Sequence, residues 1–480
     1  MSLQDSTVSA ERGWPWSVKL LIVVVGLFVF IVGGLFVLGR ASTARWQRYA
    51  AKLQADGDPL TYRQIERRRT IVPDERNSAR IIEGFMDDLE AMSDVPVVGS
   101  VFVFAKRSSG ADFFTGILRS GIEPSRVFCE QQRPLLKKLT ALRDFPTGRL
   151  DFEYAGAKNV FEILLPILTS MRAAAKLAHL DGMLKLIDQD LNGAAETAQL
   201  QFALAGMLNE YPTILGRIMQ IVMEALAVQT IENTLRVGQL RDANLALLIE
   251  SIDLHLANGT MEWALWGERA FFVAVCDELI SGKLSLTDIM IGTNDDSAAD
   301  ISSLFPDLLI RKNQIRGVEI LTRLVDAADD PIALTKAVKQ INAEVRALPV
   351  TQIIVRSILP SLSRAVALQH RITARLRSAK AILAAERFRL DTGRLPKSLE
   401  ELVPTYLEAL PIDPFTGAPL RFAFSDEGIV IYSIGEDLVD DGGLVARRKK
   451  RPQFLDVGVR LHKPEHRGLL LIDDPPDEED

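Results

Sequence analysis

The sequence is poor in cysteine, in aromatic residues and in net positive charge. Its 480 residues include two cysteines, Cys129 and Cys276, which exclude a disulfide framework and a four-thiolate zinc site but allow one disulfide or two free thiols. Aromatic residues make up 7% of a chain that is 48% hydrophobic, which favours aliphatic helix packing over a β-sandwich. With a net charge of −7 we expect no nucleic-acid partner.

Familiar catalytic motifs are missing as well. The chain contains no P-loop, no GxGxxG after a strand, no GxSxG, no HExxH and no CxxC. Each absence lowers the expectation of an enzyme, although an active site without such a motif is still compatible with the sequence. The activity is therefore left uncertain at this point, with a binding or scaffold role favoured.

One aromatic cluster keeps an enzyme open as the alternative. Carboxylates beside tryptophans are typical of carbohydrate sites, where two acids flank a glycosidic bond. The favoured interpretation is a core stripe with two solvated glutamates, and the competing one is a membrane-anchored enzyme with its site in the helical body. The cluster consists of Glu262, Trp263, Trp266, Glu268, Phe271 and Phe272.

The longest apolar run covers residues 20–38, which contain no polar side chain. A helix of that length spans about 28 Å, close to the hydrocarbon thickness of a bilayer. Trp16 precedes the run and Arg40 and Trp46 follow it, as interfacial anchors do. We therefore predict a single-pass transmembrane helix with the lipid bilayer as its partner. A cleaved signal peptide is the alternative, but its apolar core is usually only about 7–15 residues long.

The orientation of the chain is predicted from two opposing arguments. Basic residues in the stretch 41–72 follow the apolar run, and the positive-inside rule then favours a cytoplasmic body. However, a long domain after a first apolar segment is commonly translocated whatever its charge. We expect a bacterial inner-membrane protein with an extracytoplasmic body, joined to its anchor by a basic stalk.

The region after the stalk is predicted to be helical. Between Ile167 and Phe305 the only proline is Pro212, and proline is otherwise the residue that most strongly interrupts helices. This pattern suits a helix bundle or a solenoid. A further long helix is expected from Ser363 to Arg389, with apolar residues along one side and basic residues along the rest. The fold class is therefore mainly α.

The sequence changes character after this helix. Five prolines between Pro396 and Pro419 exclude a long helix there. Leu420–Phe424 and Gly428–Ser433 are apolar runs on either side of a turn, which predicts a β-hairpin. A small α+β module is therefore expected at residues 363–443.

This module resembles the C-terminal globular part of the major pseudopilins of type II secretion systems. The resemblance is carried by four pieces of sequence in the same order, namely DTGRLP at 391–396, SLEELV at 398–403, LPIDPFTG at 410–417 and YSIG at 432–435 followed by DDGG at 440–443. It implies a helix packed on a small antiparallel sheet. The whole layout also resembles large membrane-anchored proteins of unknown function in planctomycete-type bacteria.

The resemblance also implies a calcium loop, because the corresponding loop of the family binds structural calcium. Carboxylate oxygens are suitable calcium ligands, and four acids close together repel one another without a counter-ion. The expected ligands are Glu436, Asp437, Asp440 and Asp441. The start of the chain departs from the family, since Gly13 is followed by no processing motif and Val18 stands where a glutamate is required. A true secretion-system or pilus-like component is therefore the least favoured function.

These predictions define one layout and one function. The function is a membrane-anchored scaffold or binding protein that meets other envelope proteins. The expected order is an N-terminal segment (1–19), the transmembrane helix (20–38), the basic stalk (41–72), the helical body (73–362), the pseudopilin-like module (363–443) and a charged tail (444–480).

Overall fold

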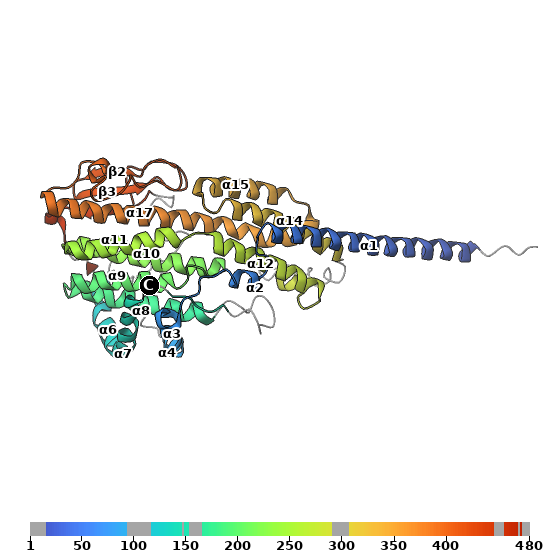
Figure 1. The fold of residues 1–480 in the computed structure, drawn as a ribbon, viewed down its shortest axis with the longest axis horizontal. Helices are drawn as coiled ribbons and strands as arrows, with labels where there is room; N and C mark the ends of the chain where they lie inside the picture. The colour runs from blue at the N-terminus through green and yellow to red at the C-terminus, as the bar shows by residue number, and fades with distance from the viewer. Residues whose placement is uncertain are drawn as a thin grey trace, which may run out of the picture.

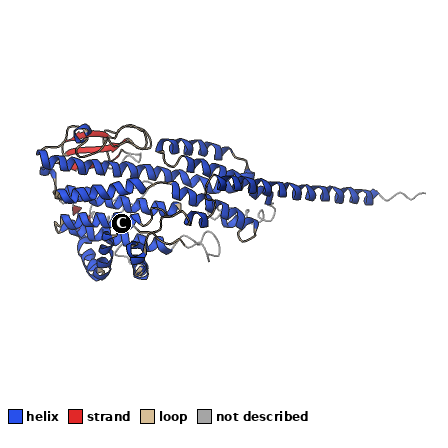
Figure 2. Ribbon diagram, in the orientation of Figure 1, coloured by secondary structure: helices blue, strands red, loops and turns tan. Residues whose placement is uncertain are grey.

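The computed structural model describes residues 16–93, 117–145, 148–152, 166–289, 307–445, 456–468 and 471–472. Long helices run side by side along an elongated body, and α1 projects from one end of it (Figure 1). A small sheet covers one side of the opposite end, and the remainder is mostly helix (Figure 2). The mainly α fold with a small C-terminal antiparallel sheet is confirmed.

The first part of the chain supplies one long helix and several short ones. These elements are α1 (Trp16–Ala55), α2 (Tyr62–Glu66), α3 (Ser78–Glu83), α4 (Met86–Ser93), β1 (Ile117–Leu118), α6 (Arg119–Gln131) and α7 (Arg133–Thr140). The main body follows with α8 (Pro166–Ile187), α9 (Leu191–Gly206), α10 (Ile214–Val237), α11 (Asp242–Asn258), α12 (Glu262–Ile280), α13 (Leu286–Ile289), α14 (Asp307–Asp326), α15 (Pro331–Ala347), α16 (Ile353–Ile358) and α17 (Leu362–Thr392). The strands of the C-terminal part are β2 (Arg421–Ser425), β3 (Gly428–Ser433), β4 (Val457–His462) and β5 (Leu471–Ile472).

Side-chain caps set where several of these helices begin. The Asp190 carboxylate accepts the Gly193 N–H of α9 at 2.9 Å, and the Thr213 hydroxyl accepts the Gly216 N–H of α10 at 2.9 Å. Asp330 does the same for α15, where it accepts the Ile332 N–H at 2.8 Å. Each cap satisfies an amide that has no partner within its own helix, so these polar residues fix the register of the helices that follow.

The segment predicted to be a basic stalk is instead part of the body. Trp46 and Leu53 on α1 are buried, and Leu60 and Ile65 beyond it are buried as well. The prediction is therefore wrong for residues 41–72, because their apolar residues recur at helical spacing and pack on the body while most of their basic residues face outward. α1 is a single helix that runs from the apolar run directly into the core.

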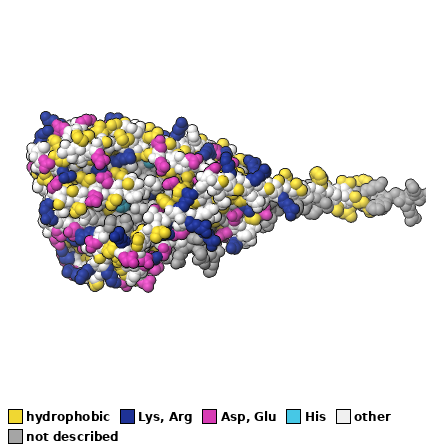
Figure 3. Space-filling model, in the orientation of Figure 1, with side chains coloured by type: hydrophobic (Ala, Val, Ile, Leu, Met, Phe, Trp, Pro, Cys, Tyr) yellow, Lys and Arg dark blue, Asp and Glu magenta, His cyan; other side chains and the backbone are white. Residues whose placement is uncertain are grey.

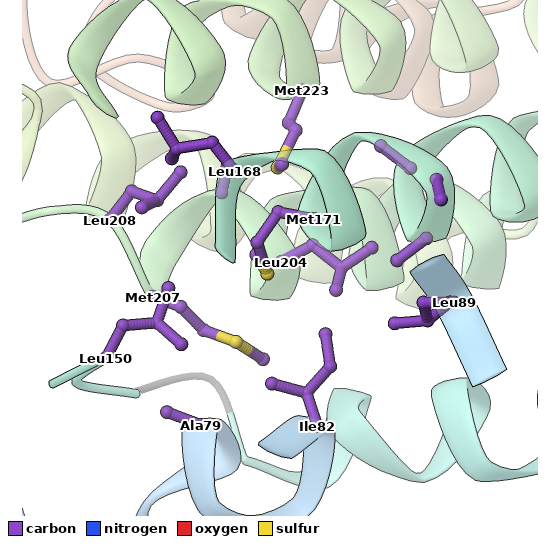
Figure 4. Close-up of a cluster of buried hydrophobic side chains, with 14 of the residues drawn as sticks. Ala79, Ile82, Leu89, Leu150, Leu168, Met171, Leu204, Met207, Leu208 and Met223 are labelled. Atoms are coloured by element: carbon purple, nitrogen blue, oxygen red, sulfur yellow. The ribbon is translucent and has the colours of Figure 1, made fainter. Parts of the chain in front are cut away.

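One core fills the part of the body that is lowest in Figure 1. Apolar side chains from α3 and α4 pack against α8, α9 and α10 (Figure 4). Residues from short loops join them, and the set drawn includes Ala79, Ile82, Leu89, Leu150, Leu168, Met171, Leu204, Met207, Leu208 and Met223. Burial of apolar side chains thus holds the short N-terminal helices to the long ones in this region.

The helical body and the C-terminal module share a second core. α17 lies between α10 and α11 on one side and β3 and β4 on the other. Ile231 of α10, Leu383 of α17 and Ile431 of β3 belong to the same buried cluster. The boundary predicted at 362/363 therefore matches the start of α17, but it does not separate two independent cores.

The sheet has three strands in the order β2-β3-β4, all antiparallel. The predicted hairpin is confirmed, with Phe422 opposite Ile431. The third strand comes from the segment predicted to be a charged tail, where Val459 lies opposite Ile431 from the other side. The module therefore extends past residue 443, because the alternating run at 457–462 lets its apolar side chains join the core.

Two further predictions can be compared with the structure. Cys129 and Cys276 are both buried and free, so the two-thiol alternative holds. Among the described residues, α10 has the length and composition of a membrane span, but 67% of its most apolar window is buried inside the body. That burial is typical of a core helix rather than of a lipid-facing one.

Candidate functional site

The aromatic cluster predicted as an enzyme site lies on the first turns of α12. The Trp263 and Trp266 rings meet edge to face with centroids 5.0 Å apart, and the Arg68 guanidinium lies 5.1 Å from the Trp266 ring. Trp263 and Trp266 also pack against the body core, while Phe272 is fully buried. The cluster is thus mainly a packing element, with one cation–π contact at its edge.

The two carboxylates of this cluster have different neighbours. Glu268 accepts the Ile214 N–H at 3.3 Å, which places a carboxylate at the N-terminus of α10. Burial raises the pKa of Glu268 to about 7. The pKa of Glu262 is raised by burial and then by the nearby Asp329. Glu268 therefore acts as a helix cap, whereas Glu262 lies near another acid.

The acidic turn predicted to bind calcium is held by its own hydrogen bonds. The Asp440 carboxylate accepts the Tyr432 hydroxyl at 3.0 Å and the Gly442 N–H at 2.9 Å, and it pairs with Arg421 at 3.2 Å. Asp437 accepts the Val439 N–H at 3.1 Å. Glu436 and Asp441 are exposed beside them.

A fifth acid completes this turn and was missed at the sequence level. Asp456 is buried just before β4 and accepts the Gly443 N–H at 2.8 Å. Burial raises the pKa of Asp456, and the charges of Asp440 and Asp441 raise it further. Within the described part of the chain, no group of three or more His, Cys, Asp or Glu side chains is placed to hold a metal ion. Calcium binding by Glu436, Asp437, Asp440 and Asp441 stays a prediction.

A buried polar network joins α10, α11 and α17. The Arg217 guanidinium pairs with Glu224 at 3.2 Å and donates to Gln369 at 2.7 Å. The two ring nitrogens of His255 face the Glu224 carboxylate and the Phe202 carbonyl, each at 3.0 Å. Burial by itself would raise the pKa of Glu224, but Arg217 and His255 hold it below its ordinary value.

This network is structural in its geometry. Every one of its charged side chains is buried, and the Gln369 amide donates to the Gly259 carbonyl at 2.7 Å. A buried charge needs such partners because the interior does not solvate it. Sequence reasoning missed the network, since its members lie far apart in the chain and follow no motif.

A second ionic cluster fixes the C-terminal segment. The buried Glu386 carboxylate accepts two bonds from Arg467, at 2.8 and 2.7 Å, and also pairs with Arg389 at 2.8 Å. Arg467 donates further to the Gly238 carbonyl at 3.1 Å. The chain after β4 is therefore tied to the ends of α10 and α17 rather than free in solvent.

The most unusual surface belongs to α1. Its N-terminal part is apolar and lies away from the body, and the Phe30 side chain is 79% exposed. Leu21, Val23 and Leu27 are also exposed on this part of the helix. Exposed aliphatic residues are costly in water, and large exposed apolar patches are typical of surfaces that contact another protein or a membrane.

No family model, no curated protein and no solved structure matches this chain. The arguments about its function therefore rest on the geometry just described.

Proposed function

We propose that the chain is a single-pass membrane protein of a bacterial envelope, in which a rigid helical body acts as a scaffold or binding platform. The observation that carries the proposal is the continuity of α1 (Trp16–Ala55). Its residues 20–38 are apolar and project from the body, whereas Trp46 and Leu53 on the same helix are buried in the core. A bilayer satisfies such a helix without exposing its apolar face to water.

The arrangement of α17 supports the scaffold role. This helix has 31 residues and so extends for about 46 Å. It begins near the end of the body from which α1 projects and ends beside the sheet at the opposite end (Figure 1). Because α17 packs in one core with both the body helices and the sheet, the body holds the sheet at a fixed distance from the anchor.

The C-terminal module supplies the part that a scaffold would present. Its layout, a long helix packed on an antiparallel sheet, agrees with what the pseudopilin resemblance implies. Asp413 lies inside the most specific matching piece, is buried, and accepts the Phe415 N–H and the Ser433 hydroxyl, each at 2.8 Å. We propose that this end contacts envelope partners and that its acidic turn at 436–441 is the place for calcium.

The membrane proposal is tested by extraction of the full-length chain from cell membranes with alkaline carbonate. We expect the protein to stay in the membrane pellet. Replacing Val24 and Leu27 by lysine places two charges in the apolar segment, each unfavourable by about 3 kcal/mol at the centre of a bilayer, and should release the protein. Leu247→Lys is the matched control, because Leu247 is an exposed leucine on α11. Release of the unmodified protein would contradict the proposal.

The side of the membrane on which the body lies is tested separately. Ser425 is exposed at the end of β2, and a Ser425→Cys variant offers one accessible thiol there. We expect a membrane-impermeant maleimide to label it in intact cells, which would place the body outside the cytoplasm. Labelling only after lysis would place the body in the cytoplasm and would remove the pseudopilin module as a guide to its partners.

A further inference from the structure

The end of the body from which α1 projects lies very close to the end of the apolar segment. Ser42 is the first buried residue after Leu38, and four residues of helix correspond to about 6 Å. The polar layer on each side of a bilayer is about 5–8 Å thick. Since α1 runs through this stretch without a break, no flexible linker separates the body from the membrane surface.

α14 reaches the same level as the end of the apolar segment. Tyr49 of α1 is hydrogen-bonded to Thr322 of α14, and the two helices pack along each other. Lys312 lies ten residues before Thr322, and Arg40 lies nine residues before Tyr49. At about 1.5 Å per residue, Lys312 and Arg40 are therefore almost level along the parallel helices.

α16 meets α14 at this level. The Asn313 side chain donates to the Thr351 carbonyl at 2.7 Å and accepts the Val355 N–H at 3.4 Å. Arg356 follows directly after this contact, and Lys312 directly precedes it. Three elements that are far apart in the sequence thus bring cations to one end of the body.

Three cations at this end of the body are exposed to solvent. Arg45, Lys312 and Arg356 are exposed, and none has a carboxylate partner among the residues that the structure describes. By contrast, the neighbouring Arg311 pairs with Asp277 at 2.7 Å, and Arg316 pairs with Glu344 at 2.6 Å. Basic side chains are visible on this tapered end beside α1 in Figure 3.

We propose that Arg45, Lys312 and Arg356 form a basic rim that contacts anionic lipid headgroups directly. The proposal rests on the proposed membrane span at residues 20–38. Position and charge support it together, because the rim is held at headgroup depth and its positive charge is not neutralised within the described body. Each cation near an anionic membrane surface raises the binding constant roughly fivefold, so three such residues should enrich anionic lipid around the helix. An acidic protein partner would use the same charges, and the test separates the two.

The test measures which lipid lies beside the rim. A fluorophore is attached to Ser357→Cys, an exposed position next to Arg356, in the full-length protein reconstituted into vesicles of phosphatidylcholine and phosphatidylglycerol. Either lipid carries a nitroxide quencher near the top of one acyl chain. We expect phosphatidylglycerol to quench several-fold more strongly than phosphatidylcholine at equal content. Arg45→Gln, Lys312→Gln and Arg356→Gln together should bring the ratio close to one, as should high salt.

Three controls make the result decisive. A label at Ser425→Cys, the last residue of β2, should be quenched by neither lipid, because β2 lies at the end of the body opposite α1 (Figure 1). The native thiols should not react, because both are buried and burial raises the pKa of Cys129 to about 12. Glutamine at Lys137, Arg241 and Lys397, which are exposed away from the rim, should leave the ratio unchanged.

The outcomes distinguish this proposal from the one before it. If the protein resists carbonate extraction but neither lipid quenches the label at position 357, or both quench it equally, the basic rim does not contact anionic headgroups and the proposal is overturned. A ratio that the triple glutamine variant leaves unchanged overturns it as well, because other residues then cause the lipid preference. If no lipid preference is seen, an acidic protein partner remains the alternative use of these charges. Failure of membrane integration contradicts the proposed span itself.

Discussion

Two apolar helices of this chain have opposite surroundings. α10 (Ile214–Val237) has a mean hydropathy of 1.4 in its most apolar window, and residues 20–38 of α1 are apolar throughout. α10 lies mostly buried inside the body, whereas the apolar part of α1 projects from it. Length and apolar content therefore do not determine where a helix lies.

The polar residues explain the difference between the two helices. α10 carries Arg217, Glu224 and Thr230 on buried positions, and each finds a partner on a neighbouring element. The segment 20–38 carries no polar side chain and so requires none. A helix with buried polar residues depends on precise protein partners, while a uniformly apolar one needs only an apolar surrounding. The following predictions test that contrast.

The largest loss of stability is expected when the buried Glu224 carboxylate on α10 is removed. Glu224→Ala leaves Arg217 and His255 buried without their carboxylate, and breaking such a buried pair typically costs about 3–5 kcal/mol of unfolding free energy. The measurement is the urea midpoint of the protein in detergent. Glu250→Ala, on the exposed face of α11, is the control and should change stability by less than about 0.5 kcal/mol. An equal response of the two variants would contradict the role of the network.

The next effect concerns the carboxylate at the start of α10. Burial raises the pKa of Glu268 from an ordinary value of 4.5 to about 7, so the folded protein binds a proton more tightly than the unfolded chain. The contribution of this residue to stability should therefore be largest below pH 4.5 and fall by about 2–3 kcal/mol as the pH rises to 7. Glu268→Gln keeps a side-chain oxygen that can accept the Ile214 N–H, but it removes the group that titrates.

The comparison of Glu268→Gln with the unmodified protein isolates this contribution. Unfolding free energy is measured at pH 5 and at pH 7.5 for both. We expect unfolding free energy to change less between the two pH values in the variant, because it lacks the titration of Glu268. Part of the change should remain, because other acids with raised pKa values, such as Glu262, are present in both proteins. An unchanged difference would show that Glu268 is ionised throughout this range.

A third contrast uses the glycines of the two regions. A Cβ added at Gly267 on α12 would lie 1.7 Å from the Pro212 carbonyl oxygen, which belongs to the backbone that leads into α10. A Cβ at Gly26 on α1 would meet nothing within 4 Å. We expect Gly267→Ala to destabilise the protein by about 1–3 kcal/mol through overpacking, and Gly26→Ala to have no such effect. Thermal unfolding in detergent measures both.

The sequence predicts the broad layout of this molecule better than its contacts. The long C-terminal helix and the hairpin after it follow from local patterns, namely helical periodicity and a turn between apolar runs, and both are present. The stalk prediction fails because charge content was given more weight than the buried spacing of Trp46 and Leu53. Helices that carry basic residues on one face still bury the other.

The candidate sites show the same division between local and distant information. The acidic turn at 436–441 was found because its residues are adjacent in the sequence, but Asp456, which completes it, comes 15 residues after Asp441. The pairing of Glu386 with Arg467 likewise joins residues separated by 81 positions. Such contacts depend on the tertiary fold, and no pattern within a short window predicts them.

The smallest effect is expected at Thr213, the N-cap residue that precedes α10. The Thr213 hydroxyl accepts the Gly216 N–H at 2.9 Å, and Thr213→Ala removes this cap at an expected cost of about 1 kcal/mol. Thr213→Ser keeps the hydroxyl and should be close to neutral. The cost of Thr213→Ala should not exceed about 1 kcal/mol, because the Glu268 carboxylate still caps the helix through the Ile214 N–H. Combining Thr213→Ala with Glu268→Ala should then cost more than the sum of the single changes, as a double-mutant cycle in urea would measure. Strict additivity would mean that the two caps act independently.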